Sequence, residues 1–154
     1  MSRAPGEWWF YQLTAASAAA AAIGPLVEKC LERGWRVLIL GEETTLSRLD
    51  EALWTWRADS FIPHGRWGED RAEHPVLLTS EPVNANGARV VMLLDGRGPP
   101  EQGFERIMTV FDAADPDVVR RAREQYRNAQ AEGRPVRFFQ LEASGWAERG
   151  GSAG

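Results

Sequence analysis

The chain has 154 residues, of which 44% are hydrophobic and 26% are charged, a composition typical of one compact globular domain. Eighteen basic residues against 22 acidic ones give a formal charge of −4. That charge argues against a surface built as a whole to bind nucleic-acid phosphates, although it leaves room for a local basic patch. With Cys30 as its only cysteine the chain forms no internal disulfide, and we expect a cytoplasmic protein. The alanine-rich run at 15–23 is too short to span a membrane and is interpreted as part of a helix, not as a signal peptide.

The first 40 residues predict a strand, a helix and a second strand. An aromatic run predicts the strand over 8–13, and the composition of 15–33 predicts a helix closed by Gly34. Gly24 and Pro25 fall inside that stretch, so either the helix begins at Pro25 or a kink divides it there. The apolar run at 36–40 is typical of a strand covered on both faces.

The middle of the chain alternates periodic and irregular stretches. Leu46, Leu49 and Leu53 recur at helical spacing and predict a helix over 44–56, with Thr44 or Thr45 as its N-cap. Residues 58–74 hold both histidines, two glycines and a proline, which predicts a long loop. Two apolar runs, at 75–79 and 89–95, predict strands separated by a turn at 84–87.

In the last third of the chain, an apolar run predicts a strand over 104–111, and residues 135–142 predict another. Between them, Asp115-Pro116-Asp117 begins a predicted helix that runs to about Glu132 and is closed by Gly133. Strands that alternate with helices indicate parallel βαβ units. We therefore predict a single α/β domain over 1–142, with a mostly parallel sheet and helices on both faces. Residues 143–154 hold four glycines and few bulky apolar residues, which predicts a flexible C-terminal tail.

The sequence lacks the motifs of the common α/β enzymes. The turn after the first strand has no glycine to cradle a phosphate, and the only lysine, Lys29, lies within a predicted helix. His64 and His74 have no zinc-type spacing, and Ser60 lacks a Gly-x-Ser-x-Gly elbow. We therefore predict no catalytic residue, no metal and no cofactor. A small α/β enzyme or nucleotide-binding protein remains the alternative.

The late helix carries an unusual stripe of arginines. Arg120, Arg123 and Arg127 fall within roughly 60° of one another on a helical wheel, beside Val119 and Tyr126. Like charges at this spacing repel, so the stripe favours an acidic partner that also carries an apolar group. Residues 117–137 contain six arginines and three acidic residues, a net charge of +3. Two alternatives stay open: a solvated arginine face, and direct binding of single-stranded DNA.

A second candidate surface is rich in aromatic residues. Exposed aromatics beside a proline are typical of protein–protein interfaces. The alternative is that this stretch folds back and covers the core. Its apolar residues are Trp54, Trp56, Phe61, Ile62, Pro63 and Trp67.

Four short motifs stand out along the chain. They are Phe10-Tyr11-Gln12-Leu13, Arg48-Leu49-Asp50-Glu51-Ala52-Leu53-Trp54, Ser60-Phe61-Ile62-Pro63-His64 and Ala122-Arg123-Glu124-Gln125-Tyr126-Arg127. Together they resemble one known family, the chi subunit of the bacterial DNA polymerase III holoenzyme. The resemblance runs from about residue 9 to 141 and keeps the motifs in order.

The resemblance implies a non-catalytic accessory subunit of the clamp loader, with a Rossmann-like, nucleotide-binding-like fold that lacks the nucleotide site. In the family the late helix binds the acidic C-terminal tail of single-stranded DNA-binding protein, whose terminal Phe enters an apolar pocket. Carried over, this role falls on Arg123, Tyr126 and Arg127. Helical geometry adds Val119 and Arg120. Arg127 stands where the family has a lysine, which keeps the charge and changes the hydrogen-bond geometry.

The resemblance also implies a surface for the psi subunit, shared in some bacteria with an accessory helicase. The corresponding residues here are Trp54, Phe61, Ile62, Pro63 and His64. Where no psi subunit exists, this surface would either serve another clamp-loader or helicase partner or be partly vestigial. We expect no direct specific DNA binding and no membrane association.

Overall fold

The computed structural model describes residues 6–13, 19–55, 61–101, 103–142 and 145–152. These ranges contain eight strands, three α-helices and one short 3-10 helix. In chain order they are β1 (Glu7–Leu13), α1 (Ala19–Glu32), β2 (Val37–Leu40), α2 (Glu43–Thr55), β3 (His64–Arg66), η1 (Arg71–Glu73), β4 (Val76–Thr79), β5 (Val90–Leu93), β6 (Arg106–Asp112), α3 (Pro116–Ala131), β7 (Val136–Glu142) and β8 (Gly145–Ser152).

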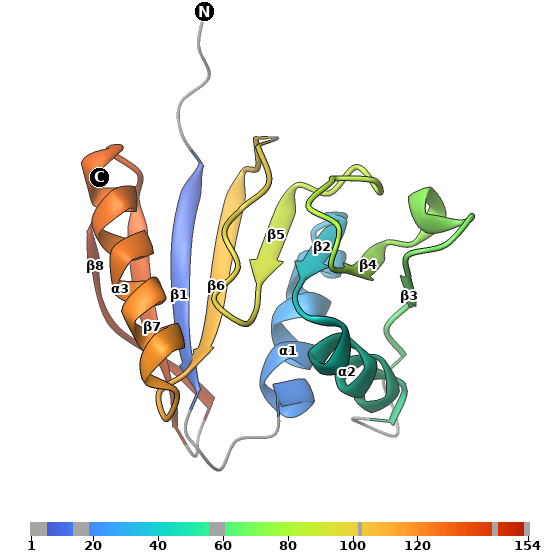
Figure 1. The fold of residues 1–154 in the computed structure, drawn as a ribbon, viewed down its shortest axis with the longest axis horizontal. Helices are drawn as coiled ribbons and strands as arrows, with labels where there is room; N and C mark the ends of the chain where they lie inside the picture. The colour runs from blue at the N-terminus through green and yellow to red at the C-terminus, as the bar shows by residue number, and fades with distance from the viewer. Residues whose placement is uncertain (1–5, 14–18, 56–60, 102, 143–144, 153–154) are drawn as a thin grey trace, which may run out of the picture.

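All eight strands form one sheet in the order β3-β4-β2-β5-β6-β1-β7-β8 (Figure 1). Every neighbouring pair is parallel except β7 and β8, which are antiparallel. The short central strands β2, β4 and β5 are buried along their whole length, as their continuous apolar sequences predict. The predicted α/β class with a mostly parallel sheet is confirmed.

Helices cover both faces of the sheet, and each face has its own core. Helices α1 and α2 pack with Val37, Ile39 and Met108 on one face. Helix α3 packs with Phe10, Leu38 and other side chains on the opposite face. In Figure 1, α3 lies beside β1 and β7, away from α1 and α2. The predicted arginine stripe lies on α3, the helix that covers this second face.

The structure differs from the predicted elements at the long loop. Residues 64–66 form the edge strand β3 and residues 71–73 form η1. The sequence gave no signal for β3 because a run of three residues, His-Gly-Arg, shows no alternation or β-branched pattern. Pro25 lies inside α1, so the helix does not begin there. Residues 15–18 and Trp56, predicted as helical, lie outside the described residues.

The expected flexible tail is wrong for residues 145–152, which form β8 and pair with β7 along its length. The indole ring of Trp146 packs edge-on against Tyr11, and its N–H donates to the Ala22 carbonyl at 3.3 Å. Arg137 on β7 forms two hydrogen bonds with Glu148 on β8. The contacts of Trp146 and the Arg137–Glu148 ion pair thus hold in place a strand whose high glycine content predicts a flexible segment. Among the described helices, none is long and apolar enough to cross a membrane.

Candidate functional site

Helix α3 has well-defined ends, which fix the positions of the side chains along it. The Asp115 carboxylate accepts hydrogen bonds from the backbone N–H groups of Asp117 and Val118, and Pro116 occupies the first turn. At the other end Gly133 adopts a φ of 73°, which glycine alone adopts without strain. The predicted helix start and stop are confirmed.

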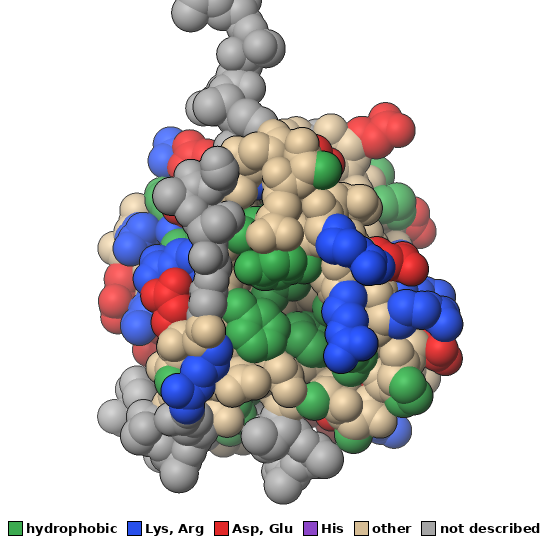
Figure 2. All heavy atoms as spheres, turned by 90° about the vertical axis from the view of Figure 1, so that its left-hand side faces the viewer, with side chains coloured by type: hydrophobic (Ala, Val, Ile, Leu, Met, Phe, Trp, Pro, Cys, Tyr) green, Lys and Arg blue, Asp and Glu red, His purple; other side chains and the backbone are tan. Residues whose placement is uncertain are grey.

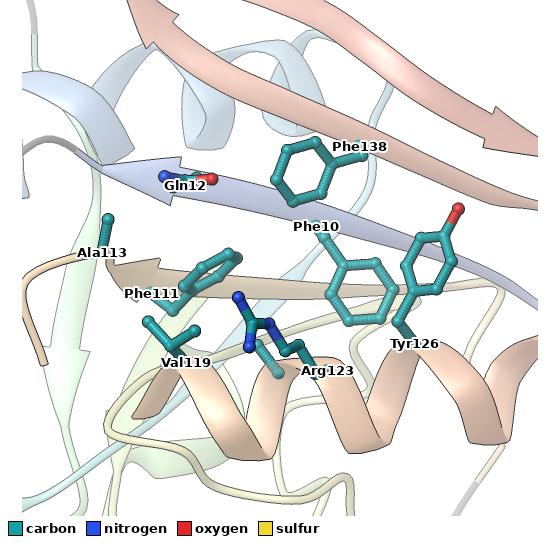
Figure 3. Close-up of a pocket in the computed structure, with 9 residues that line it drawn as sticks. Phe10, Gln12, Phe111, Ala113, Val119, Arg123, Tyr126 and Phe138 are labelled. Atoms are coloured by element: carbon teal, nitrogen blue, oxygen red, sulfur yellow. The ribbon is translucent and has the colours of Figure 1, made fainter. Parts of the chain in front are cut away.

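A hollow of about 290 Å³ separates the N-terminal half of α3 from the sheet. Its floor is aromatic: Phe10 on β1, Phe111 on β6 and Phe138 on β7 all face it (Figure 3). Val119 and Tyr126 from α3 close it on the helix side. The Tyr126 ring is tilted against the Phe10 ring at 5.3 Å between centroids, which holds the phenol at the edge of the hollow.

The arginine stripe lies along the rim of this hollow. Arg123 lines it, and Figure 3 shows its side chain reaching from α3 toward the sheet. A shallower hollow beside the first is lined by Val119, Arg120, Arg123 and Arg127. Figure 2 shows a green apolar surface with basic side chains on both sides of it. The structure therefore brings together all five side chains predicted for tail binding.

The charges of the stripe are mostly available to a ligand. Within the described ranges, neither Arg123 nor Arg127 forms a salt bridge, and both are exposed. Arg120 lies 3.5 Å from Asp117, but both side chains are largely exposed, so this pair contributes little. Within the described residues, therefore, no carboxylate neutralises Arg123 or Arg127.

Sequence reasoning missed the floor of the hollow. The sequence places Phe10 in a family motif, and it places Phe111 and Phe138 in predicted strands, but it does not indicate that the three rings meet. Phe10 and Phe138 are direct neighbours in the register of β1 and β7. That pairing was not readable from the sequence, because β1 and β7 are far apart in the chain and their adjacency is a property of the sheet order. The two-residue period of a strand places Trp8, Phe10 and Gln12 on one face, but it does not show which strand lies beside that face.

This arrangement can bind a ligand that combines an apolar side chain with carboxylate groups. An aromatic floor can take one apolar side chain, and guanidinium groups on the rim can bind carboxylates through paired hydrogen bonds. The residues lining the hollow include no histidine, cysteine or carboxylate to act as a base or nucleophile. In the described ranges, no group of three or more His, Cys, Asp or Glu side chains is arranged to hold a metal ion.

The structure divides the five residues predicted for the second surface. Trp54 and Phe61 are 49% and 71% exposed, and their rings contact each other at 5.5 Å. Pro63 is half-buried, whereas Ile62 and His64 are buried. Ile62 and His64 therefore hold the segment in place, and only the other three residues can contact a partner. Residues 56–60, including Trp56, lie outside the described ranges.

His64 fixes this segment to α2. Its Nδ1 lies 2.7 Å from the Ile62 carbonyl oxygen, and its Nε2 lies 2.9 Å from an Asp50 carboxylate oxygen. Its ring also packs under Trp54, with 4.1 Å between ring centroids. Trp67, 39% exposed, stacks with the Arg71 guanidinium nearby. The exposed aromatics thus rest on a buried polar anchor.

Fold and site together define an α/β protein with a Rossmann-like layout and an aromatic-floored hollow, with arginines on its rim, beside its last helix. Comparison with known proteins makes this more specific. Residues 6–137 match the family described as DNA polymerase III chi subunit, HolC, and the chain belongs to that family. It is 30% identical over 119 residues to the DNA polymerase III subunit chi of Pseudomonas aeruginosa, covering 75% of this chain and 82% of that protein. It is also 33% identical over 75 residues to a probable DNA polymerase III subunit chi of Rickettsia prowazekii, covering 47% of this chain and 46% of that protein.

Proposed function

We propose that this chain is a non-catalytic accessory subunit of the clamp-loader complex that binds the acidic C-terminal tail of single-stranded DNA-binding protein. The observation that carries the proposal is the aromatic-floored hollow with Arg123 on its rim. The terminal Phe of the tail would enter the hollow between α3 and the sheet. Its α-carboxylate and the preceding acidic side chains would meet Arg120, Arg123 and Arg127.

Size and charge both support this assignment. A hollow of about 290 Å³ lies at the lower end of the range for ligand sites, which suits one side chain better than a nucleotide cofactor. The two arginines without salt bridges in the described structure supply charge-assisted hydrogen bonds that add directional specificity. Attraction of this kind falls with ionic strength, whereas burial of the Phe ring does not. The two contributions can therefore be measured separately.

The test is a titration with a labelled peptide ending in Asp-Asp-Ile-Pro-Phe, followed by fluorescence anisotropy. We expect a dissociation constant in the micromolar range, on the order of 10 μM. Arg123→Ala and Arg127→Ala each weaken binding, and added salt weakens it in the wild type. A peptide that lacks the terminal Phe, and one with an amidated C-terminus, each bind at least about tenfold less tightly.

The matched control is Arg121→Ala. Arg121 is exposed on the same helix, but its side chain packs beside Gly96, away from the hollow. The control removes the same charge from α3 and leaves the site intact, so we expect peptide affinity close to that of the wild type. A second variant, Ala113→Phe, fills the hollow from its rim without changing any charge and blocks the peptide. If Arg123→Ala and Arg127→Ala bind the peptide as the wild type does, the proposed site is wrong.

A second partner surface is supported by the exposed Trp54–Phe61 pair. We propose that these rings, with Pro63, bind a psi subunit or another clamp-loader or helicase protein. Large exposed aromatics in contact with each other are typical anchors of protein interfaces. The test is co-purification of partners with the wild type and with Phe61→Ala from native cells. Loss of the same partner from Phe61→Ala, with the tail peptide still bound normally, supports this surface, and unchanged co-purification overturns it.

A further inference from the structure

The sheet face opposite the tail site carries an alternating ladder of arginines and aromatic rings. The Arg33 and Arg106 guanidinium groups lie 5.1 and 5.2 Å from the Trp35 ring. Arg106 also lies 3.6 Å over the Trp9 ring. Arg137 follows at 4.5 Å from Trp9 and 5.3 Å from Phe139. Neither the arginine stripe on α3 nor the Trp54–Phe61 surface includes any of these side chains.

The register of the strands explains why these residues share one face. Trp9 on β1 is the direct neighbour of Met108 on β6 and of Arg137 on β7. Tyr11, two residues along β1, is the neighbour of Phe139, and their rings stack at 4.9 Å. Because alternate residues of a strand point to opposite faces, Phe10 and Phe138 face α3 while these residues face away from it. The ladder therefore spans β6, β1 and β7 on the α1 side of the sheet.

A second hollow, of about 300 Å³, opens over this ladder between α1 and the sheet. Trp9, Phe139 and Trp146 line it, and all three are half-buried, so part of each ring remains exposed. From α1 and the turn after it, Lys29 and Arg33 reach the same hollow.

The basic side chains around this hollow differ in whether they form salt bridges. Arg106 and Arg137 pair with Glu7 and Glu148. Lys29 and Arg33 are exposed and form no salt bridge within the described part of the chain. Four basic side chains line the hollow and no acidic one does. A local positive field therefore exists inside a protein whose formal charge is −4.

We propose that this face binds single-stranded nucleic acid without sequence preference, with a base stacked on the ladder rings and phosphates held by Lys29 and Arg33. Single-strand binding sites combine a basic groove with aromatic side chains, because every base has a flat face that stacks. Aromatic rings on a sheet face are a known platform for this mode of binding, and here the half-buried Trp9, Phe139 and Trp146 line the open hollow. An acidic peptide would bind the basic side chains but would make no stacking contact with the aromatic rings. Single-stranded nucleic acid would contact both, because its phosphates bind the basic side chains and its bases stack on the rings. This site lies on the opposite face of the sheet from the proposed tail site.

The test uses the full chain and a fluorescein-labelled oligothymidylate of about ten nucleotides, measured by anisotropy at about 50 mM salt. We expect weak binding, with a dissociation constant of roughly 10 to 100 μM, that falls steeply with salt. The double variant Lys29→Ala/Arg33→Ala weakens binding about tenfold or more, and it lowers the slope of log K against log salt by about 1.4, or about 0.7 for each lost phosphate contact. Phe139→Leu keeps an apolar side chain but removes the flat ring, and weakens binding about fivefold.

Arg123→Ala is the control on the opposite face, and it leaves oligonucleotide binding unchanged. Conversely, Lys29→Ala/Arg33→Ala leaves binding of the tail peptide unchanged, so the two proposals fail or succeed separately. Three results overturn the inference: no anisotropy change at about 100 μM protein, equal affinity for a duplex of the same length, or tighter binding of an oligoglutamate peptide through Lys29 and Arg33. A selective loss in the two ladder-face variants supports it.

Discussion

The Thr109 hydroxyl on β6 donates a hydrogen bond of 2.7 Å to the side-chain oxygen of Gln125 on α3, and both side chains are buried. The same hydroxyl accepts from the Trp8 indole N–H at 2.9 Å. The Gln125 amide in turn donates to the Arg97 carbonyl at 2.9 Å. These bonds fix the rotation of α3 about its axis, because Gln125 lies between Arg123 and Tyr126. Hydrogen bonds between buried polar side chains in an apolar interface thus hold Arg123 and Tyr126 toward the hollow.

Thr109→Val tests this chain of hydrogen bonds. Valine has nearly the shape of threonine but leaves the Trp8 N–H and the Gln125 oxygen without a partner. A buried polar group that loses its partner costs about 1–3 kcal/mol, so we expect the free energy of unfolding to fall by about 3 kcal/mol. Urea denaturation measures it. Thr44→Val, at an exposed position of α2, is the control and changes stability by less than about 0.5 kcal/mol. A similarly small effect of Thr109→Val would contradict the proposed role.

Local patterns were enough to predict the class of fold and the boundaries of α3. Asp115, Pro116 and Gly133 act only on neighbouring backbone, so their effect is visible in a short stretch of sequence. The arginine stripe was equally accessible, because a helical wheel places side chains on one helix face without reference to the rest of the fold.

Long-range relationships were not predictable. The N-cap expected from Thr44 or Thr45 is one example: α2 begins at Glu43, and the Asp95 carboxylate, from the loop after β5, bonds the Glu42 N–H and the Thr45 hydroxyl. Strand β8 is another, since its docking depends on contacts with Tyr11 and Ala22 more than 120 residues away. The aromatic floor of the hollow likewise requires knowledge of the sheet order.

His64 supports the second partner surface from beneath. His64→Ala removes the contacts to Ile62 and Asp50 and leaves a cavity under Trp54, so we expect a loss of about 2 kcal/mol in unfolding free energy. Hydrogen exchange of the backbone amides at 61–66 increases as well. Phe61→Ala, at a largely exposed position, changes stability by less than about 0.5 kcal/mol. Equal effects of the two substitutions would show that His64 is not an anchor.

We expect the Arg137–Glu148 pair, which joins β7 to β8, to make the stability of the protein depend on pH. The hydrogen bond from Arg137 holds the pKa of the Glu148 carboxyl below its usual range. A carboxyl whose pKa is lowered by folding stabilises the folded state above its unfolded pKa of about 4.3, and this stabilisation is lost as the pH falls through the folded value. We therefore expect wild type to be more stable than Glu148→Gln at neutral pH, with the difference shrinking in acid. Glu51→Gln, on the exposed side of α2, is the matched control. Urea denaturation at several pH values measures the difference, and a constant difference across that range would contradict the role of the pair.

Trp146 provides the main apolar contact between β8 and the rest of the sheet. Its ring packs on Tyr11 and its N–H reaches the Ala22 carbonyl, so Trp146→Ala removes both a half-buried ring and a hydrogen bond. Because the ring is only partly buried, we expect a loss of about 2 kcal/mol rather than the larger cost of a fully buried tryptophan. Trp67→Ala removes an equally large ring from an exposed site and costs less than about 1 kcal/mol. Hydrogen exchange at residues 145–152 distinguishes the two variants, since only Trp146→Ala releases β8 while the parallel part of the sheet stays protected. If β8 amides remain protected in Trp146→Ala, backbone pairing with β7 holds the strand without the ring.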